Sequence, residues 1–224
     1  MKTNWAIIEC VSEGRTLLLG IIQAAGWPIW PLLACSIAAL ALIFERIYSL
    51  QTKRIIPPQL LDEVLTLSHP ALLKPESIEQ LKSHCALGEI IVAGLNHMQR
   101  KPASTESELR AVVEASGRRV NSKLEHYLSA LGSIASVAPL LGLFGTVIGM
   151  IEIFGAQTPG AGNPAQLAHG ISVALYNTAF GLVIAIPSLV MWRYFRNKVD
   201  HFTVELEISA ERLVRHFYAT KSGK

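Results

Sequence analysis

Long stretches without a charged side chain constrain this sequence more than any other feature. No Asp, Glu, Lys or Arg occurs within residues 16–44, 127–151 or 170–192. Each stretch exceeds the roughly 20 residues that a helix needs to cross the hydrocarbon layer of a bilayer. The overall hydrophobic fraction of 50% would also fit a soluble protein, so the clustering decides the class. The sequence therefore predicts an all-α integral membrane protein with three transmembrane helices.

The distribution of Lys and Arg predicts how these spans are oriented. Most basic residues lie between the first two spans or after the third, whereas residues 155–168 contain none. Positively charged loops stay in the cytoplasm. We therefore expect the N-terminus outside the cytoplasm, and the middle segment and the C-terminus inside.

The predicted segments follow from the spans and the charges. In chain order they are an extracytoplasmic amphipathic N-terminal helix (1–27), the first transmembrane helix (28–50), a cytoplasmic helical loop (51–127), the second transmembrane helix (128–155), a periplasmic loop (156–168), the third transmembrane helix (169–193) and a cytoplasmic helical tail (194–224). Glu9, Glu13 and Arg15 interrupt the apolar N-terminal residues. An interfacial helix suits this pattern, while a fourth span and a signal peptide stay open as alternatives.

The second and third spans are predicted to continue as long helices into the cytoplasm. Thr105 and Glu108 form a capping-box pattern, and no proline separates them from the second span. A continuous helix from Thr105 to Phe154 would be about 75 Å long at about 1.5 Å per residue. Apolar residues recur at helical spacing on both extensions: Leu109, Val112, Val113, Val120, Leu124, Leu128 and Leu131, then Val199, Phe202, Leu206, Leu213 and Phe217. The preceding segment is expected to form shorter helices, broken at Pro70, Pro75 and Pro102.

Small residues mark the faces on which the second and third spans are expected to meet. Helices in lipid associate by close packing and hydrogen bonding, so small side chains gather at their contacts. These faces are Ala135, Ala138, Gly142, Gly145 and Gly149 in the second span, and Gly170, Ala174, Thr178, Gly181, Ala185 and Ser188 in the third. The first span has bulkier side chains and is predicted to lie outside this pair.

Thr146 and Thr178 are candidate residues of a polar pathway. By helical rise they lie about 7 Å and about 4–5 Å outward of their span midpoints, hence at nearly one level. In a ring of subunits they would form a polar belt, together with Asn177. Alternatively, each hydroxyl bonds to a carbonyl of its own helix. Neither span has a carboxylate at mid-depth. Glu152 belongs to the second span, but it lies near the outer end.

Two prolines lie within the predicted spans. Pro139 and Pro187 each remove a backbone donor, so we expect a bend in each helix. These bends would let a pore wall flare or flex, and ordinary packing kinks explain them equally well.

The sequence gives no sign of an enzyme, a metal site or a bound cofactor. The three cysteines belong to no C-x-x-C pair, and no H-E-x-x-H, nucleophile elbow or phosphate-binding Gly-rich loop is present. The acidic pair Asp62-Glu63 reads as a solvated surface. We therefore predict a membrane protein that is not an enzyme.

Two motifs in the spans resemble a known family. The run Ala-Pro-Leu-Leu-Gly-Leu-Phe-Gly-Thr-Val-Ile-Gly-Met at 138–150 is similar to the second-span signature of the ExbB/TolQ/MotA proton-channel family. Residues 170–182, with Ala-Ile-Pro at 185–187, resemble its third-span signature. Three spans with a large inner loop resemble ExbB and TolQ rather than the four-span MotA.

The resemblance implies a homopentameric ring in a bacterial inner membrane. Such a ring encloses a small single-span partner of the ExbD/TolR kind, whose aspartate would lie beside Thr146 and Thr178. Proton passage would then drive motion that a TonB-like protein carries to the outer membrane.

Three points stay open after this resemblance. Some ExbB proteins have a glutamate where this chain has Val173, so a mechanism that needs that acid is not carried over. Pro-Leu-Leu-Gly in the second span favours an ExbB-like role, with a TolQ-like subunit of the Tol-Pal envelope system as the alternative. A passive membrane scaffold that moves no ions is the third reading.

Overall fold

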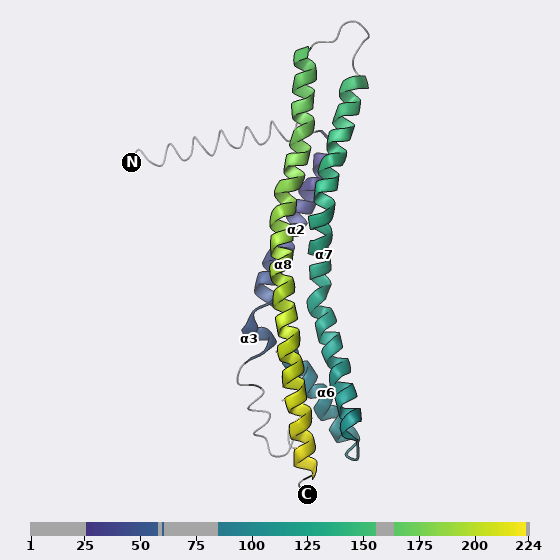
Figure 1. Cartoon of the computed structure of the whole chain (residues 1–224), viewed down its shortest axis with the longest axis vertical. Coiled ribbons are helices and arrows are strands. Elements are labelled where there is room, and N and C mark those ends of the chain that lie inside the picture. The colour runs from purple at the N-terminus through teal and green to yellow at the C-terminus, as the bar shows by residue number, and fades with distance from the viewer. Residues whose placement is uncertain (1–25, 58–59, 61–84, 156–163, 223–224) are drawn as a thin grey trace, which may run out of the picture. The chain divides into compact units, whose positions relative to one another are not determined.

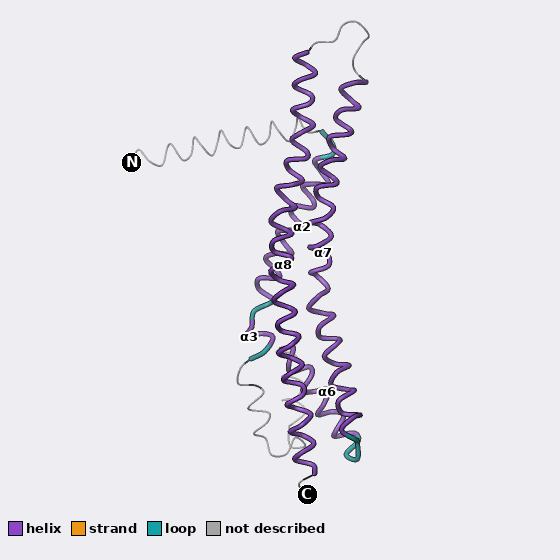
Figure 2. Tube along the Cα trace, viewed as in Figure 1, coloured by secondary structure: helices purple, strands orange, loops and turns teal. Residues whose placement is uncertain are grey.

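A computed structural model describes residues 26–57, 60, 85–155 and 164–222 of the chain. Its helices are α2 (Ile29–Ser49), α3 (Thr52–Ile55), α6 (Ala86–Arg100), α7 (Glu106–Gly155) and α8 (Pro164–Ser222) (Figure 1). Figure 2 shows helices joined by short loops and no strand in these ranges. Nearly all of the predicted N-terminal helix, the breaks at Pro70 and Pro75, and residues 156–163 of the predicted periplasmic loop lie outside the described residues.

Local sequence signals explain where the helices begin and end. The N–H of Glu108 donates to Oγ1 of Thr105, and the N–H of Thr105 donates to the Glu108 carboxylate, both at 3.3 Å. This reciprocal pair is the predicted capping box at the start of α7. Pro102 lies between the end of α6 and this cap, as expected. Ahead of α2, Gly26 has a φ of +72°, a conformation that a residue without Cβ adopts readily.

The two long helices are continuous, as predicted. α7 is one helix of 50 residues and α8 one helix of 59 residues, with Pro139 and Pro187 inside them. α8 begins at Pro164, within the segment that the sequence assigned to a loop. Proline is favoured at the first helical position because its fixed φ suits a helix and its missing N–H would have no intrahelical partner there.

Two compact units make up the chain, and α2, α7 and α8 contribute residues to both. The first unit comprises Met1–Ile43 and Ala130–Met191, and the second comprises Phe44–Ser129 and Trp192–Lys224.

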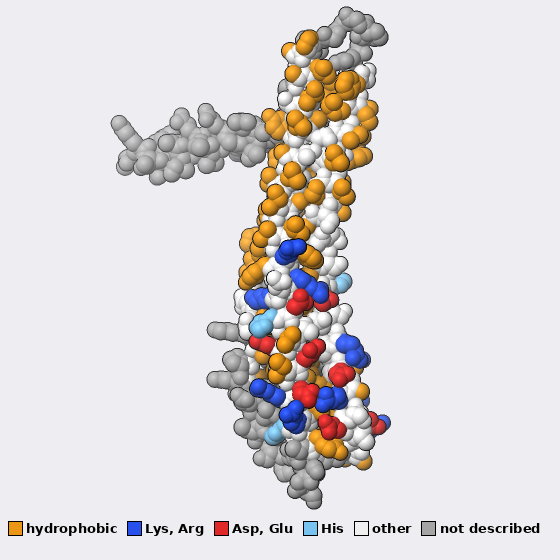
Figure 3. Space-filling view, viewed as in Figure 1, with side chains coloured by type: hydrophobic (Ala, Val, Ile, Leu, Met, Phe, Trp, Pro, Cys, Tyr) orange, Lys and Arg blue, Asp and Glu red, His pale blue; other side chains and the backbone are white. Residues whose placement is uncertain are grey.

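The first unit has the composition of a membrane-embedded structure. Among its described residues, Glu152 is the only Asp, Glu, Lys or Arg. Large apolar side chains stay exposed on it, such as Ile37 at 70%, Leu140 at 63% and Val183 at 66%, and Figure 3 shows apolar side chains over this part. Within the described part of the chain, α2, α7 and α8 are long and apolar enough to cross a membrane. The three long apolar helices predicted from the sequence are therefore present.

The second unit is a helical bundle with many charged side chains on its surface. α6 packs on α7 and α8, since a Cβ added at Gly94 would lie 3.3 Å from Val113 and 3.6 Å from Leu213. Its core is made of buried aliphatic and aromatic side chains: Leu87, Ile90, Ile91, Leu95, Leu109, Val113, Val120, Leu128, Phe195, Val199, Phe202, Leu206, Leu213 and Phe217. Figure 3 shows acidic and basic side chains gathered over this part. Apolar burial against water therefore holds this unit together.

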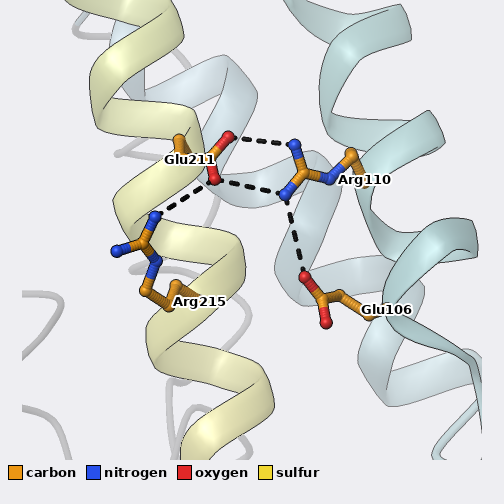
Figure 4. A network of polar contacts seen from close by, with 4 residues as sticks. All are labelled: Glu106, Arg110, Glu211 and Arg215. Atoms are coloured by element: carbon orange, nitrogen blue, oxygen red, sulfur yellow. Dashed lines mark hydrogen bonds and ion pairs between the residues drawn. The ribbon is translucent and has the colours of Figure 1, made fainter.

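Polar contacts join α7 to α8 along the second unit. They are Glu125 with Arg196 at 3.2 Å, Asn121 with Thr203 at 2.8 Å, and Arg110 with Glu211 at 2.9 Å. In Figure 4 the guanidinium of Arg110 faces the carboxylate of Glu211, with Glu106 and Arg215 beside them. The hydrogen bond from Arg110, with a further one from Arg215, lowers the pKa of Glu211 below its ordinary value.

A buried arginine fixes the end of α2 in the second unit. The side chain of Arg46 is 3% exposed; its Nη1 donates to the carbonyl oxygen of Leu124 at 2.9 Å and its Nε to Glu45 at 2.6 Å. Its guanidinium carbon lies 4.6 Å from the centroid of the Tyr127 ring. A planar cation that stacks and donates at several points suits this place better than lysine would. Arg46 thus ties α2 to α7.

Replacing Arg46 with alanine should destabilise the protein. Arg46→Ala removes a charge-assisted hydrogen bond and its ring contact, and should lower the free energy of unfolding by about 1.5–3 kcal/mol. The free energy is measured by denaturant unfolding of the detergent-solubilised protein, followed by circular dichroism. Arg118→Ala is the matched control, because Arg118 is 73% exposed and makes only a 3.8 Å pair with Glu114. Equal stability of the two variants would contradict the anchoring role of Arg46.

The Arg110–Glu211 pair should make the stability of the second unit sensitive to acid. Because the pKa of Glu211 is lower in the folded state, its contribution is present above the ordinary glutamate pKa and is lost as the pH falls through the folded value. Glu211→Gln should therefore flatten the decline in unfolding free energy below about pH 4.5. The effect is modest and fades with added salt, since both groups are solvent-exposed. Acid titrations of both proteins at low and high salt test this, and identical slopes would contradict it.

Candidate functional site

The backbones of α7 and α8 lie very close together in the first unit at two glycines. A Cβ added at Gly181 would lie 2.7 Å from the carbonyl oxygen of Ala138 and 3.2 Å from the Cα of Gly142. A Cβ added at Gly142 would lie 2.8 Å from the carbonyl oxygen of Asn177 and 3.0 Å from the Cα of Thr178. Only glycine fits at both positions without a shift of the backbone.

The neighbouring turns of α7 and α8 are matched in size. Gly145 faces Asn177, whose side chain is buried, and Gly149 faces Ala174, which is also buried. A Cβ at Gly149 would lie 3.2 Å from the Cβ of Ala174. At these two levels the side chain of α8 therefore lies opposite a glycine of α7.

Other residues of the predicted small faces are also at low exposure. Ala135 is 7% exposed, Ala138 0%, Ala185 6% and Ser188 1%. The hydroxyl of Ser188 donates to the carbonyl oxygen of Ile184 at 2.7 Å, one turn earlier and next to Pro187. Small residues beyond the two glycines are thus buried in the first unit as well.

The two threonines lie on adjoining turns of this contact. Thr146 follows Gly145 and Thr178 follows Asn177, and Gly145 and Asn177 face each other, so the contact brings the threonines to one level. Both are half-buried. The Thr146 hydroxyl donates to the carbonyl oxygen of Leu143 at 2.7 Å, so it makes the bond within its own helix that was the predicted alternative. Its oxygen can still accept a hydrogen bond from another group.

Asn177 occupies a different environment from the threonines. Its side chain is 2% exposed and lies against Gly145, inside the contact between α7 and α8. Sequence reasoning grouped it with the threonines because it is polar. Its spacing was the better signal: it follows Ala174 by three positions and precedes Gly181 by four, on the small face of the helix.

An open apolar hollow lies beside Thr146. It is lined by Thr146, Val147, Met150, Ile151 and Phe154 on one side of α7. In the described residues no three His, Cys, Asp or Glu side chains are grouped as metal ligands would be. Hydroxyl and amide groups can hydrogen-bond to a proton carrier, but they do not titrate usefully near neutral pH.

Comparison with known proteins relates this chain to membrane channel subunits. Residues 82–208, more than half of the chain, match the model of a family described as the MotA/TolQ/ExbB proton channel family. An ExbB-like biopolymer transport protein of Synechocystis is 31% identical, over 85% of this chain and 78% of that protein. The biopolymer transport protein exbB1 of Vibrio cholerae is 32% identical, over 83% of this chain and 82% of that protein.

Two further proteins are similar to this chain. The Tol-Pal system protein TolQ of Pseudomonas aeruginosa is 35% identical, over 48% of this chain and 50% of that protein. A solved structure of the flagellar MotAB stator complex from Bacillus subtilis aligns with a TM-score of 0.48 at 18% identity, covering 98% of this chain and 90% of that chain.

A methyl group at Gly181 should disturb the packing of α7 against α8. In Gly181→Ala the new Cβ meets backbone atoms, which cannot rotate away. Overpacking of this kind typically costs about 1–3 kcal/mol, measured as the loss of unfolding free energy in detergent. Gly155→Ala is the control, because nothing lies within 4 Å of a Cβ added there. Unchanged stability of Gly181→Ala would show that α7 and α8 do not approach this closely.

Proposed function

Because the chain belongs to the MotA/TolQ/ExbB proton channel family, we propose that it is an ExbB-like stator subunit of a bacterial inner membrane. In this role it forms a proton channel with an ExbD-like partner. It uses the proton motive force to energise TonB-dependent transport at the outer membrane. Its N-terminus is periplasmic and its C-terminus cytoplasmic, in keeping with the distribution of Lys and Arg.

The observation that carries this proposal is the level at which the two threonines lie. The contact of Gly145 with Asn177 brings Thr146 and Thr178 to adjoining turns of two membrane-crossing helices. Their hydroxyls are polar groups in an apolar layer, where they bind a proton-carrying side chain or water far better than the surrounding aliphatic residues can.

The partner supplies the titratable group. Among the described residues of the first unit the only carboxylate is Glu152, near the end of α7, so a carrier at mid-depth comes from another chain. An ExbD/TolR-like single span brings an aspartate beside the threonines. It protonates from one side and releases the proton to the other. No step requires an acid at Val173.

A homopentameric ring accounts for the exposed apolar faces of the first unit. Leu143 is 56% exposed, Val147 49% and Ile151 61% on α7, and Leu175 is 60% exposed on α8. In the ring these faces contact neighbouring copies, the enclosed partner span and lipid. The hollow beside Thr146 gives an apolar side chain of a neighbouring helix a place to insert.

A TolQ-like role in the Tol-Pal envelope system is the second candidate. It is favoured by the 35% identity to the TolQ of Pseudomonas aeruginosa, which covers about half of each chain. Co-expression decides between the two: the chain is purified with an ExbD-like and with a TolR-like partner in competition. Native mass spectrometry then shows which partner a pentamer retains.

Loss of either threonine hydroxyl should reduce proton flux. Thr146→Val and Thr178→Val keep the side-chain shape but remove the hydrogen-bonding group. Each should lower the flux of the complex in proteoliposomes roughly tenfold, as expected when one hydrogen bond to a transition state is lost. Thr146→Ser and Thr178→Ser, which keep the hydroxyl, are the matched controls. A passive scaffold would assemble equally well and show no flux with any of these sequences.

A further inference from the structure

Asn177 is a polar side chain buried in the part of α8 that crosses the membrane. It is 2% exposed, in a unit whose other buried side chains are almost all apolar or very small. Its neighbours on the same face of α8 are Ala174 and Gly181, and both of them pack against α7. Asn177 is therefore the widest of the three α8 side chains in this contact.

A single gap in α7 accommodates this side chain. A Cβ added at Gly145 would lie 2.8 Å from the Cβ of Asn177, 2.9 Å from its Cγ and 3.0 Å from its Nδ2. The adjoining α7 positions are already taken: Gly142 meets the backbone at Thr178 and Gly181, and Gly149 meets Ala174. If α8 moved along α7 by one turn so that Asn177 took the place of Gly181, the Cβ of Asn177 would lie 2.7 Å from the carbonyl oxygen of Ala138.

We propose that Asn177 is a positioning residue that locks α8 to α7 through Gly145. It sets the rotation and height at which Thr178 lies level with Thr146, and its amide is not itself on the proton path. This inference rests on the proposed channel function, which gives the level of the threonines its importance.

The nearest atom to a Cβ added at Gly145 is the Cβ of Asn177, at 2.8 Å. The Cβ of residue 177 is fixed by the backbone, so no rotamer change of Asn177 relieves a clash with a methyl group at position 145. Gly145→Ala should therefore push the helices apart. In that background Asn177→Gly removes the obstructing Cβ, whereas Asn177→Ala keeps it. Since glycine is the poorer helix former, helix propensity alone predicts the opposite order of the two double variants.

The test uses the full chain with its ExbD-like partner and two independent measurements. The first is proton flux per assembled complex in proteoliposomes. The second is the yield of an intramolecular disulfide between Gly149→Cys and Ala174→Cys, in a background with Cys10, Cys35 and Cys85 changed to serine. A Cβ added at Gly149 would lie 3.2 Å from the Cβ of Ala174, a little under the roughly 3.5–4.5 Å of a disulfide, so a small separation suffices for the bond to form. The disulfide reports the register of the helices whether or not ions move.

In Gly145→Ala both measurements should fall by roughly tenfold, the population change expected from an overpacking substitution. Adding Asn177→Gly should restore most of the disulfide yield and part of the flux, and adding Asn177→Ala should restore neither. Gly155→Ala is the control, since a Cβ there contacts nothing within 4 Å, and both measurements should stay at the level of the unsubstituted chain.

Equal rescue by glycine and alanine at position 177, or an unchanged disulfide in Gly145→Ala, would overturn the positioning role. An unsubstituted complex that assembles but passes no protons would overturn the channel function instead. The disulfide yields would then still decide whether Asn177 sets the register.

Discussion

The backbones of α7 and α8 approach each other closely at Gly142 and Gly181, and the packing of these two helices in the first unit depends on that approach. In lipid there is no hydrophobic force to draw two helices together, so van der Waals contact and hydrogen bonding must do it. These act only at short range, and a Cβ at either glycine would meet backbone atoms within 3 Å. The place of Asn177 and the common level of the two threonines both follow from this approach.

The same two helices associate by different means in the second unit. There water is present, so burying Val113, Phe202 and Leu213 is favourable in itself. Polar pairs such as Asn121 with Thr203 add directionality to that non-directional force. Each of these continuous helices thus has a different kind of contact surface in each unit. The first unit relies on small residues and close backbones, and the second on bulky core residues and charged surface pairs.

This division suits the proposed channel subunit, in which a partner chain supplies the titratable carrier. The described spans offer hydroxyls and closely packed backbones, and Glu152 lies near the end of α7. This arrangement fits a chain that belongs to the MotA/TolQ/ExbB proton channel family. A partner carboxylate that changes its protonation state needs polar groups held at a fixed height, and the Gly145–Asn177 contact supplies that height under our proposal.

The sequence by itself determined the all-helical membrane class, the three long apolar helices and the start of α7, but not the start of α8, which begins at Pro164 within the predicted loop. Charge-free stretches, the capping box of Thr105 with Glu108, and Pro102 are local signals whose effect does not depend on distant residues, and the motif at 138–150 was enough to indicate the family. The burial of Arg46 on Leu124 and the pairing of Asn177 with Gly145 were decided only by the tertiary structure. Helical periodicity specifies which face of each helix is small, but it leaves open the rotation and the axial offset of one helix against another. Those two quantities are fixed only when both surfaces are fitted together.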